Sequence, residues 1–174
     1  MNDYTERQNR VLTELESTDG AVSGSELADR CKVTRQVVVH DIAILRAKGE
    51  PIVSTPRGYM YLKNNAALTR KQHVLSVYHP PELVGRELEI LVDYGFRIKD
   101  VVVEHPLYGE LRGSLLLSSR RDVEFFLQKA SPSNGTLLSN LTGGYHLHTI
   151  ESDSLDHLPD AIAELRKNGI QVFD

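Results

Sequence analysis

The sequence contains a single cysteine among its 174 residues. One cysteine excludes a disulfide framework within the chain and a zinc site built from several thiolates. The scarcity of cysteine also suits a reducing compartment. We expect Cys31 to be packed as a small apolar side chain rather than to act as a redox sensor.

Long hydrophobic runs are absent as well. No apolar segment approaches the roughly 18 residues that a membrane-spanning helix needs. The N-terminal residues MNDYTERQNR contain no apolar core of a signal peptide. The sequence therefore predicts a cytoplasmic protein that does not bind membranes. Hydrophobic residues make up 40% of the chain and charged residues 25%, which indicates a folded protein rather than a disordered one.

The chain has no overall excess of positive charge. Its formal net charge is −4, which by itself disfavours nucleic acid as a partner. The charge is unevenly distributed, however, because residues 30–63 carry seven basic and two acidic side chains. The acidic surplus lies entirely after the polar stretch that precedes Leu68. We predict two domains, one over residues 1–66 and one over residues 67–174.

The first part of the chain predicts three helices followed by a β-hairpin. Helical spacing of apolar residues predicts a helix over residues 4–16. Ser23 and Glu26 form a capping-box pattern that opens a second helix, and Thr34 can cap a third. Residues 52–62 predict two strands around a turn made rigid by proline and flexible by glycine. Helices and hairpin in this order are typical of a winged helix-turn-helix.

The third helix and the hairpin carry the residues expected to contact DNA. Polar side chains at the N-terminal end of a recognition helix reach base edges in the major groove. The residues predicted to contact DNA are Thr34, Arg35, Gln36, Val39 and His40 on the helix and Arg57 at the hairpin tip. A lone charged helix face is usually only solvated. The surrounding elements favour DNA binding over a role in protein contacts alone.

The first domain also resembles a known DNA-binding family. The segment SGSELADRCKVTRQVVVHDIAILRAKGEPIVSTPRGYMYL is similar to the winged helix-turn-helix of the biotin-repressor type. The similarity covers residues 4–62. It implies that the helix beginning at Arg35 enters the major groove and that Arg57 lies near a phosphate or the minor groove.

The second part of the sequence predicts mixed strands and helices. Strands are expected over residues 73–78, 98–104, 114–117, 145–149 and 170–173, and helices over residues 80–93, 120–129 and 155–168. Ser119 and Ser154 are the expected N-caps of the last two helices. This pattern predicts an α/β sandwich with a mostly antiparallel sheet, so the whole chain is expected to be an α+β protein.

Histidines supply most of the candidate chemistry in this second part, which holds six of the seven. His146 and His148 lie two apart on a predicted strand, so both imidazoles point to one face and can bind one metal ion. His79 and Glu87 can face the same pocket. Three imidazoles and a carboxylate suit Zn, Ni, Fe, Co or Mn rather than Ca or Mg. On spacing alone, such histidines are more often surface or hydrogen-bonded side chains, and Glu87 a helix-surface carboxylate.

Three long segments resemble the three-histidine regulatory domain of nicotinate-responsive repressors of NAD biosynthesis genes. They are VYHPPELVGRELEILVDYG, DVVVEHPLYGELRGSLLLSSRRDVEFF and LLSNLTGGYHLHTIES, within about residues 70–174. The resemblance implies nicotinate, or a related pyridine carboxylate, as co-repressor. The metal ligands that it implies are His79, Glu87, His146 and His148. His105 matches another histidine of that family and is expected either to orient the ligand or to fix the loop before Gly109.

We expect the metal to bind the co-repressor through its carboxylate or its pyridine nitrogen. Tyr108 and Arg112 can complete the ligand site by packing on the ring or pairing with the carboxylate. A co-repressor must bind the DNA-competent arrangement more tightly than the incompetent one. Helix-turn-helix proteins usually bind DNA as symmetric dimers, so we expect a homodimer joined through the second domain. His73 and His157 have no motif support and are expected to be structural or surface residues.

Other functions remain open at this point. The metal ion itself can be the signal, with nicotinate having no effect. A metal hydrolase would need an open coordination position and a general base, for which Glu104 or Glu110 is available. A biotin-ligase-like domain needs a longer chain and a glycine-rich loop, and no such loop or nucleophile motif is present. We therefore predict a repressor of NAD biosynthesis or nicotinate uptake genes that binds operator DNA and is not an enzyme.

Overall fold

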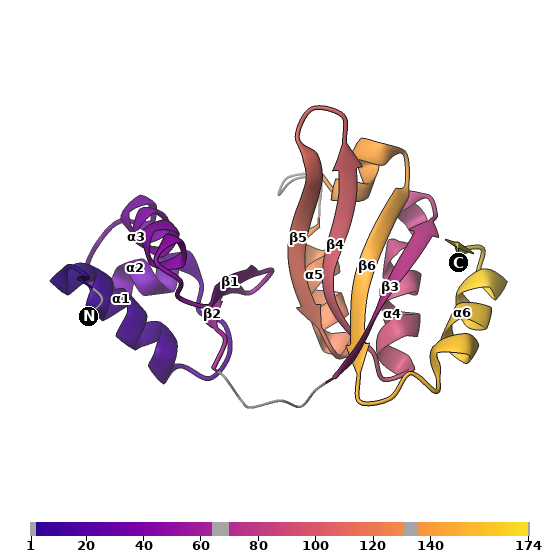
Figure 1. Cartoon of the computed structure of the whole chain (residues 1–174), viewed down its shortest axis with the longest axis horizontal. Helices are drawn as coiled ribbons and strands as arrows, with labels where there is room; N and C mark the ends of the chain where they lie inside the picture. Colours follow the sequence, from indigo (N-terminus) through magenta and orange to yellow (C-terminus); the bar gives the residue numbers. More distant parts are fainter. Residues whose placement is uncertain (1–2, 64–69, 131–135, 174) are drawn as a thin grey trace. The chain divides into compact units, whose positions relative to one another are not determined.

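A computed structural model of the chain describes residues 3–63, 70–130 and 136–173. The chain divides into two compact units, Met1–Ala66 and Ala67–Asp174, and each is described by itself (Figure 1). The junction predicted between residues 66 and 67 lies outside the described residues. None of the helices in the described segments is long and apolar enough to cross a membrane.

Three capped helices form most of the first unit. They are α1 (Glu6–Ser17), α2 (Gly24–Cys31) and α3 (Arg35–Ala47). Thr5 caps α1 in a full capping box with Gln8. Ser23 and Thr34 accept hydrogen bonds from main-chain N–H groups at the starts of α2 and α3, as predicted. Lys32 adopts a left-handed conformation (φ 56°) that ends α2 and allows the tight turn into α3.

The hairpin is fastened to the loop between α1 and α2. Its strands are β1 (Ile52–Thr55) and β2 (Gly58–Tyr61). Val22 and Tyr59 exchange two main-chain hydrogen bonds of 2.8 Å, so Val22 adds a third short segment to the wing. Gly58 has φ +126°, and a Cβ there would lie 2.3 Å from the Val22 oxygen. Gly58 is therefore needed for a close main-chain contact. The sequence had instead suggested that this glycine makes the turn flexible.

The first unit has its own apolar core, which includes Val11, Leu15, Leu27, Val38, Ile42 and Leu45. Cys31 lies in this core, and burial raises the pKa of its thiol, so it packs as a small apolar group. Asp41 on α3 is fully buried and accepts hydrogen bonds from Arg7 Nε at 2.6 Å and Nη2 at 2.9 Å. This bidentate pair fixes α3 against α1.

The second unit is built on one antiparallel sheet. Its strands are β3 (Lys71–Tyr78), β4 (Arg97–His105), β5 (Gly109–Leu117), β6 (Tyr145–Ser152) and β7 (Gln171–Phe173). They are arranged in the order β5-β4-β6-β3-β7, and all neighbouring pairs are antiparallel, which confirms the predicted α+β class. β5 begins at Gly109, five residues before the predicted start, because β4 and β5 form one continuous hairpin.

Helices cover one face of this sheet (Figure 1). They are α4 (Val84–Asp93), α5 (Arg120–Lys129) and α6 (Leu158–Lys167), with 3-10 turns η1 (Pro81–Leu83) and η2 (Leu138–Thr142). Ser119 caps α5 as predicted. The expected Ser154 cap was wrong: α6 begins three residues later than predicted, after His157, and Ser154 Oγ instead accepts from Asp156 N–H at 3.0 Å.

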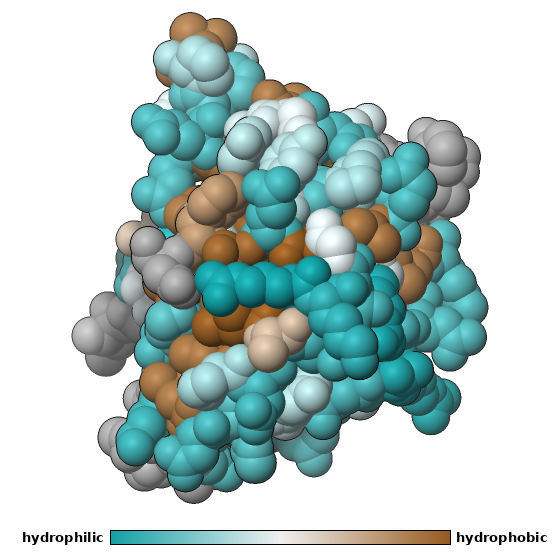
Figure 2. All heavy atoms as spheres, turned by 90° about the vertical axis from the view of Figure 1, so that its right-hand side faces the viewer, coloured by the Kyte–Doolittle hydropathy of each residue, from teal (hydrophilic) through white to brown (hydrophobic). Residues whose placement is uncertain are grey.

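The core of the second unit lies between the helices and the sheet, and includes Leu75, Val77, Leu88, Leu91, Ile98, Ile150 and Leu165. Strand alternation turns the neighbours of these residues to the opposite face. Val74, Tyr145 and Phe173 are exposed there. The side of this unit that carries α6 and β7 is mostly hydrophilic, with hydrophobic side chains gathered near its middle (Figure 2). Some apolar surface is therefore left uncovered.

Candidate metal centre and DNA-contacting helix

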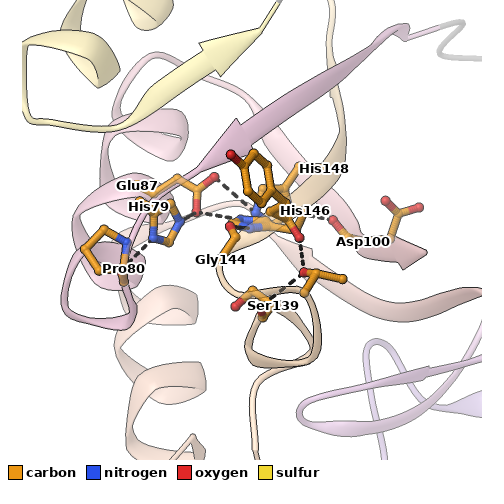
Figure 3. A network of polar contacts seen from close by, with 10 residues as sticks. His79, Pro80, Glu87, Asp100, Ser139, Gly144, His146 and His148 are labelled. Carbon is orange, nitrogen blue, oxygen red and sulfur yellow. Dashed lines mark hydrogen bonds and ion pairs between the residues drawn. The ribbon is translucent and has the colours of Figure 1, made fainter. Parts of the chain in front are cut away.

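Four predicted ligands meet between the sheet and α4. His79 follows β3, Glu87 lies in the first turn of α4, and His146 and His148 lie on β6. The register of β3 and β6 places His146 opposite Val77 and His148 opposite Leu75, whose side chains belong to the core. Leu147, between the two histidines, faces the other side of the sheet. All four ligand candidates are buried, and their side chains converge (Figure 3).

The carboxylate of Glu87 lies at the centre of this group. Its Oε2 lies 2.5 Å from His79 Nε2 and 3.2 Å from His146 Nε2. Its Oε1 lies 3.3 Å from His148 Nε2. The ligand atoms of His79, Glu87 and His146 all lie within 4.8 Å of one another, the spacing of a metal-binding group. His148 joins them through the other carboxylate oxygen.

Main-chain carbonyls set the orientation and tautomer of all three imidazoles. The contacts are His79 Nδ1 to Pro80 O (2.8 Å), His146 Nδ1 to Gly144 O (2.9 Å) and His148 Nδ1 to Asp100 O (2.7 Å). A carbonyl oxygen only accepts, so each Nδ1 carries the hydrogen and donates it. In the neutral ring, each Nε2 then presents a lone pair toward Glu87. Outer contacts of this kind are typical of histidines that bind metals.

Three lone pairs and a carboxylate that face one another need a cation between them. His148 Nε2 and Glu87 Oε1 are buried and have no hydrogen-bond partner, although they face each other. A proton can supply the positive charge, and so can a metal ion. The donor set of three imidazole nitrogens and one carboxylate fits a divalent transition metal.

Without a metal, the centre is strongly coupled to protons. Burial lowers the pKa of His79 and His148, but hydrogen bonds and the charge of Glu87 outweigh it and leave both pKa values raised. Burial raises the pKa of Glu87, but the nearby histidines, His148 first, outweigh it and hold that pKa well below its usual range. The metal-free centre therefore favours a carboxylate that is paired with protonated histidine.

Two residues that orient the histidines, Gly144 and Asp100, were not among the predicted site residues. Gly144 has φ +109°, and a Cβ there would lie 2.6 Å from the His79 oxygen. This glycine lets the turn before β6 approach His79, while its carbonyl orients His146. The pair of glycines before the histidine motif is a sequence signal for such a turn. Asp100 gives no comparable signal, because it orients His148 through its main chain.

His105 and Tyr108 lie at the tip of the β4–β5 hairpin rather than in the buried centre. His105 Nδ1 accepts hydrogen bonds from the main-chain N–H groups of Leu107 (3.1 Å) and Tyr108 (3.3 Å). The rings of His105 and Tyr108 contact each other, with centroids 5.1 Å apart. Of the two predicted roles for His105, these contacts match the one in which it fixes the loop. Tyr108 is 70% exposed.

Arg112 points away from the centre. It lies opposite Val102, which pairs with Leu147 on the sheet face that His146 and His148 do not use. Its guanidinium pairs with Asp100 and Glu110. In the described residues, no polar contact joins His105, Tyr108 or Arg112 to the four ligand side chains. His73 on β3 and His157 at the start of α6 also lie outside the group.

The predicted DNA-contacting residues of the first unit are all exposed, and most of them lie on α3 or at its N-cap. Arg35, Gln36, Val39 and His40 are exposed, whereas Val38, Asp41, Ile42 and Leu45 face the core. Thr34 is exposed at the N-cap. Arg57 is exposed at the turn between β1 and β2. The arrangement leaves basic and hydrogen-bonding side chains at the N-terminal end of α3, the end that reaches base edges in this motif.

Two other cations near α3 have structural roles. Arg46 donates from Nε to the Ile52 oxygen and from Nη2 to Ser54 Oγ, both at 2.7 Å, and so joins α3 to the hairpin. Lys48 Nζ donates to the main-chain oxygen of Asp3 at 2.8 Å. Of the basic residues in 30–63, Arg46 and Lys48 thus hold the unit together, whereas Arg35 on α3 and Arg57 on the hairpin are exposed.

Comparisons with known proteins match both units. The HTH domain family matches residues 7–60, and the 3H domain family matches residues 72–174. The chain is 36% identical over 169 residues to the transcription repressor NadR of Bacillus subtilis, covering 97% of this chain and 94% of the relative. It is 40% identical over 167 residues to the probable transcription repressor NiaR of Thermotoga maritima, covering 96% and 94%.

Both relatives are named as regulators of transcription rather than as enzymes, which confirms the prediction that the chain is not an enzyme. Their similarity spans the helix-turn-helix and the domain that holds the buried histidines. The chain belongs to the family of transcription repressors that join an HTH domain to a 3H domain.

Proposed function

We propose that the chain represses NAD biosynthesis or nicotinate uptake genes by binding operator DNA when the second unit holds a metal ion and nicotinate. The observation that carries the metal part is the buried group of lone pairs around Glu87, where Glu87 Oε1 and His148 Nε2 lie 3.3 Å apart without a hydrogen bond. The observation that carries the DNA part is the exposed polar end of α3 in a matched HTH domain. The two relatives, named as repressors, support the regulatory role.

In this proposal His79, Glu87, His146 and His148 hold one divalent transition metal, such as Zn, Ni, Fe, Co or Mn. The bound metal supplies an electrophilic site for a carboxylate or pyridine nitrogen. The protein's part is to hold the imidazoles in the Nδ1–H tautomer, so that each Nε2 is available. Arg112 does not serve as the carboxylate partner in this arrangement, because Asp100 and Glu110 already pair with it.

On the DNA side, Arg35 and Gln36 contact base edges, with Thr34, Val39 and His40 beside them, while Arg57 contacts the backbone or the minor groove. A helix-turn-helix of this kind reads two half-sites as a symmetric pair, so the active species is a homodimer. Nicotinate strengthens operator binding by favouring the dimer arrangement that fits both half-sites.

Calorimetric titration of nicotinate tests the ligand assignment. We expect nicotinate to bind metal-loaded wild-type protein, and not the chelator-treated protein or a metal-treated His146→Ala variant. His157→Ala, which changes an exposed histidine outside the centre, is the matched control and should bind as wild type. Equal binding with and without metal would overturn the proposal.

A second function has one observation in its favour. The residues expected to complete the nicotinate site, His105, Tyr108 and Arg112, do not contact the buried centre in the described residues. A regulator that senses only the metal would need no such contacts. It predicts operator binding that changes on metal loading and is unaltered by nicotinate.

A further inference from the structure

An irregularity in β4 lies directly beside the metal centre. Ile98 pairs with Ile150, and Val102 pairs with Leu147, so four steps along β4 match three steps along β6. One extra residue is therefore accommodated in β4 between these two pairs. Such β-bulges commonly redirect groups next to functional sites. Asp100 lies within this bulge.

Asp100 contacts β6 through both its main chain and its side chain. Its carbonyl oxygen accepts from His148 Nδ1 at 2.7 Å, and its Oδ1 accepts from the main-chain N–H of Thr149 at 2.9 Å. Its other carboxylate oxygen pairs with Arg112. A single buried residue thus holds the His148 ring and the peptide that follows it.

The side chain matters because the bulge interrupts the regular pairing of β4 with β6. On the other side of the strand, Asp100 still pairs with Ser114 of β5. The Asp100 carboxylate ties the bulge to Thr149 on β6, and this keeps the Asp100 carbonyl in line with His148 Nδ1. If that carbonyl moved, the His148 ring could rotate or carry its hydrogen on Nε2, and the lone pair toward Glu87 would be lost.

We propose that Asp100 is the positioning residue of His148, and that Arg112 fixes Asp100 from the opposite face of the sheet. The inference rests on the metal centre of the proposed function, and it gives Arg112 a role other than ligand binding. Arg112 is 52% exposed at its side chain, against 8% for Asp100. Because solvent weakens its ion pair, Arg112 contributes less to the position of His148 than Asp100 does.

The test uses the full chain and measures Zn²⁺ affinity by chelator competition. We expect Asp100→Ala to lower affinity by about 10- to 100-fold, the usual effect of losing an outer contact to a metal ligand. Asp100→Asn keeps an oxygen for the Thr149 N–H and should restore part of the affinity. Arg112→Ala should give a smaller loss than Asp100→Ala. Glu110→Gln, which removes only the exposed partner of Arg112, should leave affinity unchanged.

A second readout separates positioning from a general loss of stability. In metal-free protein, at a pH high enough for the His148 ring to be neutral, ¹⁵N NMR of that ring should report hydrogen on Nδ1 in the wild type and a shifted tautomer balance in Asp100→Ala. Val123→Ala, a core variant in α5, should lower thermal stability without changing either Zn²⁺ affinity or the tautomer. If Asp100→Ala does not fold, Asp100→Asn carries the same comparison, with a smaller expected change.

Failure of this inference is distinguishable from failure of the proposed function. If the wild type binds Zn²⁺ and folded Asp100→Ala binds it equally well with an unchanged tautomer, Asp100 does not position His148. If the two folded variants, Asp100→Ala and Val123→Ala, lose affinity alike, the effect of Asp100 is only structural. If the wild type itself binds no metal, the proposed centre fails, and the NMR comparison still decides whether Asp100 sets the tautomer.

Discussion

The proposed function gives Glu87 one role in the metal-free protein and another in the metal-loaded protein. Without metal, its buried charge is balanced by protons on the surrounding histidines, which have raised pKa values at His79 and His148. In the proposed metal-loaded state, the same carboxylate is a ligand and the imidazoles must be neutral. Protons and metal therefore compete for one site.

The first prediction concerns the pH dependence of stability. A raised histidine pKa stabilises the metal-free fold fully below the ordinary value of 6.5, and this contribution is lost as pH rises through the folded pKa. The lowered pKa of Glu87 contributes above its ordinary 4.5 and is lost as pH falls through the folded value. In thermal unfolding of chelator-treated protein, the Glu87–histidine pairing should therefore stabilise the fold between pH 4.5 and 6.5. This stabilisation should decline as pH rises above 6.5.

Glu87→Gln is the variant that tests this dependence. It removes the charge that raises the two histidine pKa values, so the loss of stability above pH 6.5 should become smaller. Zn²⁺ affinity should rise with pH in the wild type, because fewer protons then compete for the imidazoles. A wild type whose stability has the same pH profile as Glu87→Gln would show that this coupling is absent.

A second prediction concerns Arg35, at the exposed N-terminal end of α3. Arg35→Ala should weaken operator binding by about 1–3 kcal/mol if the guanidinium contacts a base. Arg10→Ala is a matched control, since Arg10 is a half-exposed cation on α1 whose guanidinium lies 3.9 Å from the Glu6 carboxylate. Fluorescence anisotropy on an operator duplex selected from a random pool would measure both. Wild-type affinity in Arg35→Ala would exclude it as a base-contacting residue.

At the scale of elements, the turn between η2 and β6 determines whether His79 and His146 can meet. Gly143 and Gly144 both have positive φ, of +66° and +109°. A Cβ at Gly143 would meet no atom within 4 Å, whereas one at Gly144 would collide with the His79 carbonyl. An alanine would have a strained backbone at either position, but only at Gly144 would its Cβ also collide with another atom.

The third prediction uses this pair of glycines. Gly143→Ala should cost about 1–2 kcal/mol of unfolding free energy from its left-handed backbone alone. Gly144→Ala should cost more and should also lower Zn²⁺ affinity, because His79 or β6 must shift. Urea unfolding and chelator competition measure the two effects. If both variants bound Zn²⁺ equally well, the close approach at Gly144 would have no role in the site.

The elements show why some features followed from the sequence and others did not. Helix starts with local caps, at Ser23, Thr34 and Ser119, depend on adjacent residues and were predicted. α6 begins after His157, and no side chain caps this start with a hydrogen bond. The sequence therefore offers no capping residue at the true start, and Ser154 was predicted as the cap instead. The extended β5 depends on pairing with β4, which periodicity alone does not specify.

The candidate ligands were suggested by histidine spacing and chosen by family resemblance. Their convergence required the β3–β6 register, which is a tertiary feature. The carbonyls of Pro80, Asp100 and Gly144 could not be predicted, because any residue type offers the same main-chain acceptor. Arg112 was expected at the ligand, but strand alternation places it on the opposite face.

For the whole molecule, two separate cores imply two cooperative units. We predict two transitions in calorimetric unfolding of the full chain. Excess Zn²⁺ should raise the transition temperature of the second unit only. The unfolding free energy of that unit should increase by about 2.7 kcal/mol when free Zn²⁺ is about 100 times its Kd. Leu15→Ala, in the first core, should lower the other transition and so identify it. A single transition that shifts as a whole with Zn²⁺ would contradict two units that unfold separately.

We propose that the metal centre of one unit controls DNA binding by the other through nicotinate. The most direct measurement is the affinity of the metal-loaded protein for its operator duplex, with and without nicotinate, at one fixed salt concentration. We predict tighter binding with nicotinate in the wild type and no nicotinate effect in His146→Ala. Equal operator affinity with and without nicotinate in metal-loaded wild type would contradict the claim.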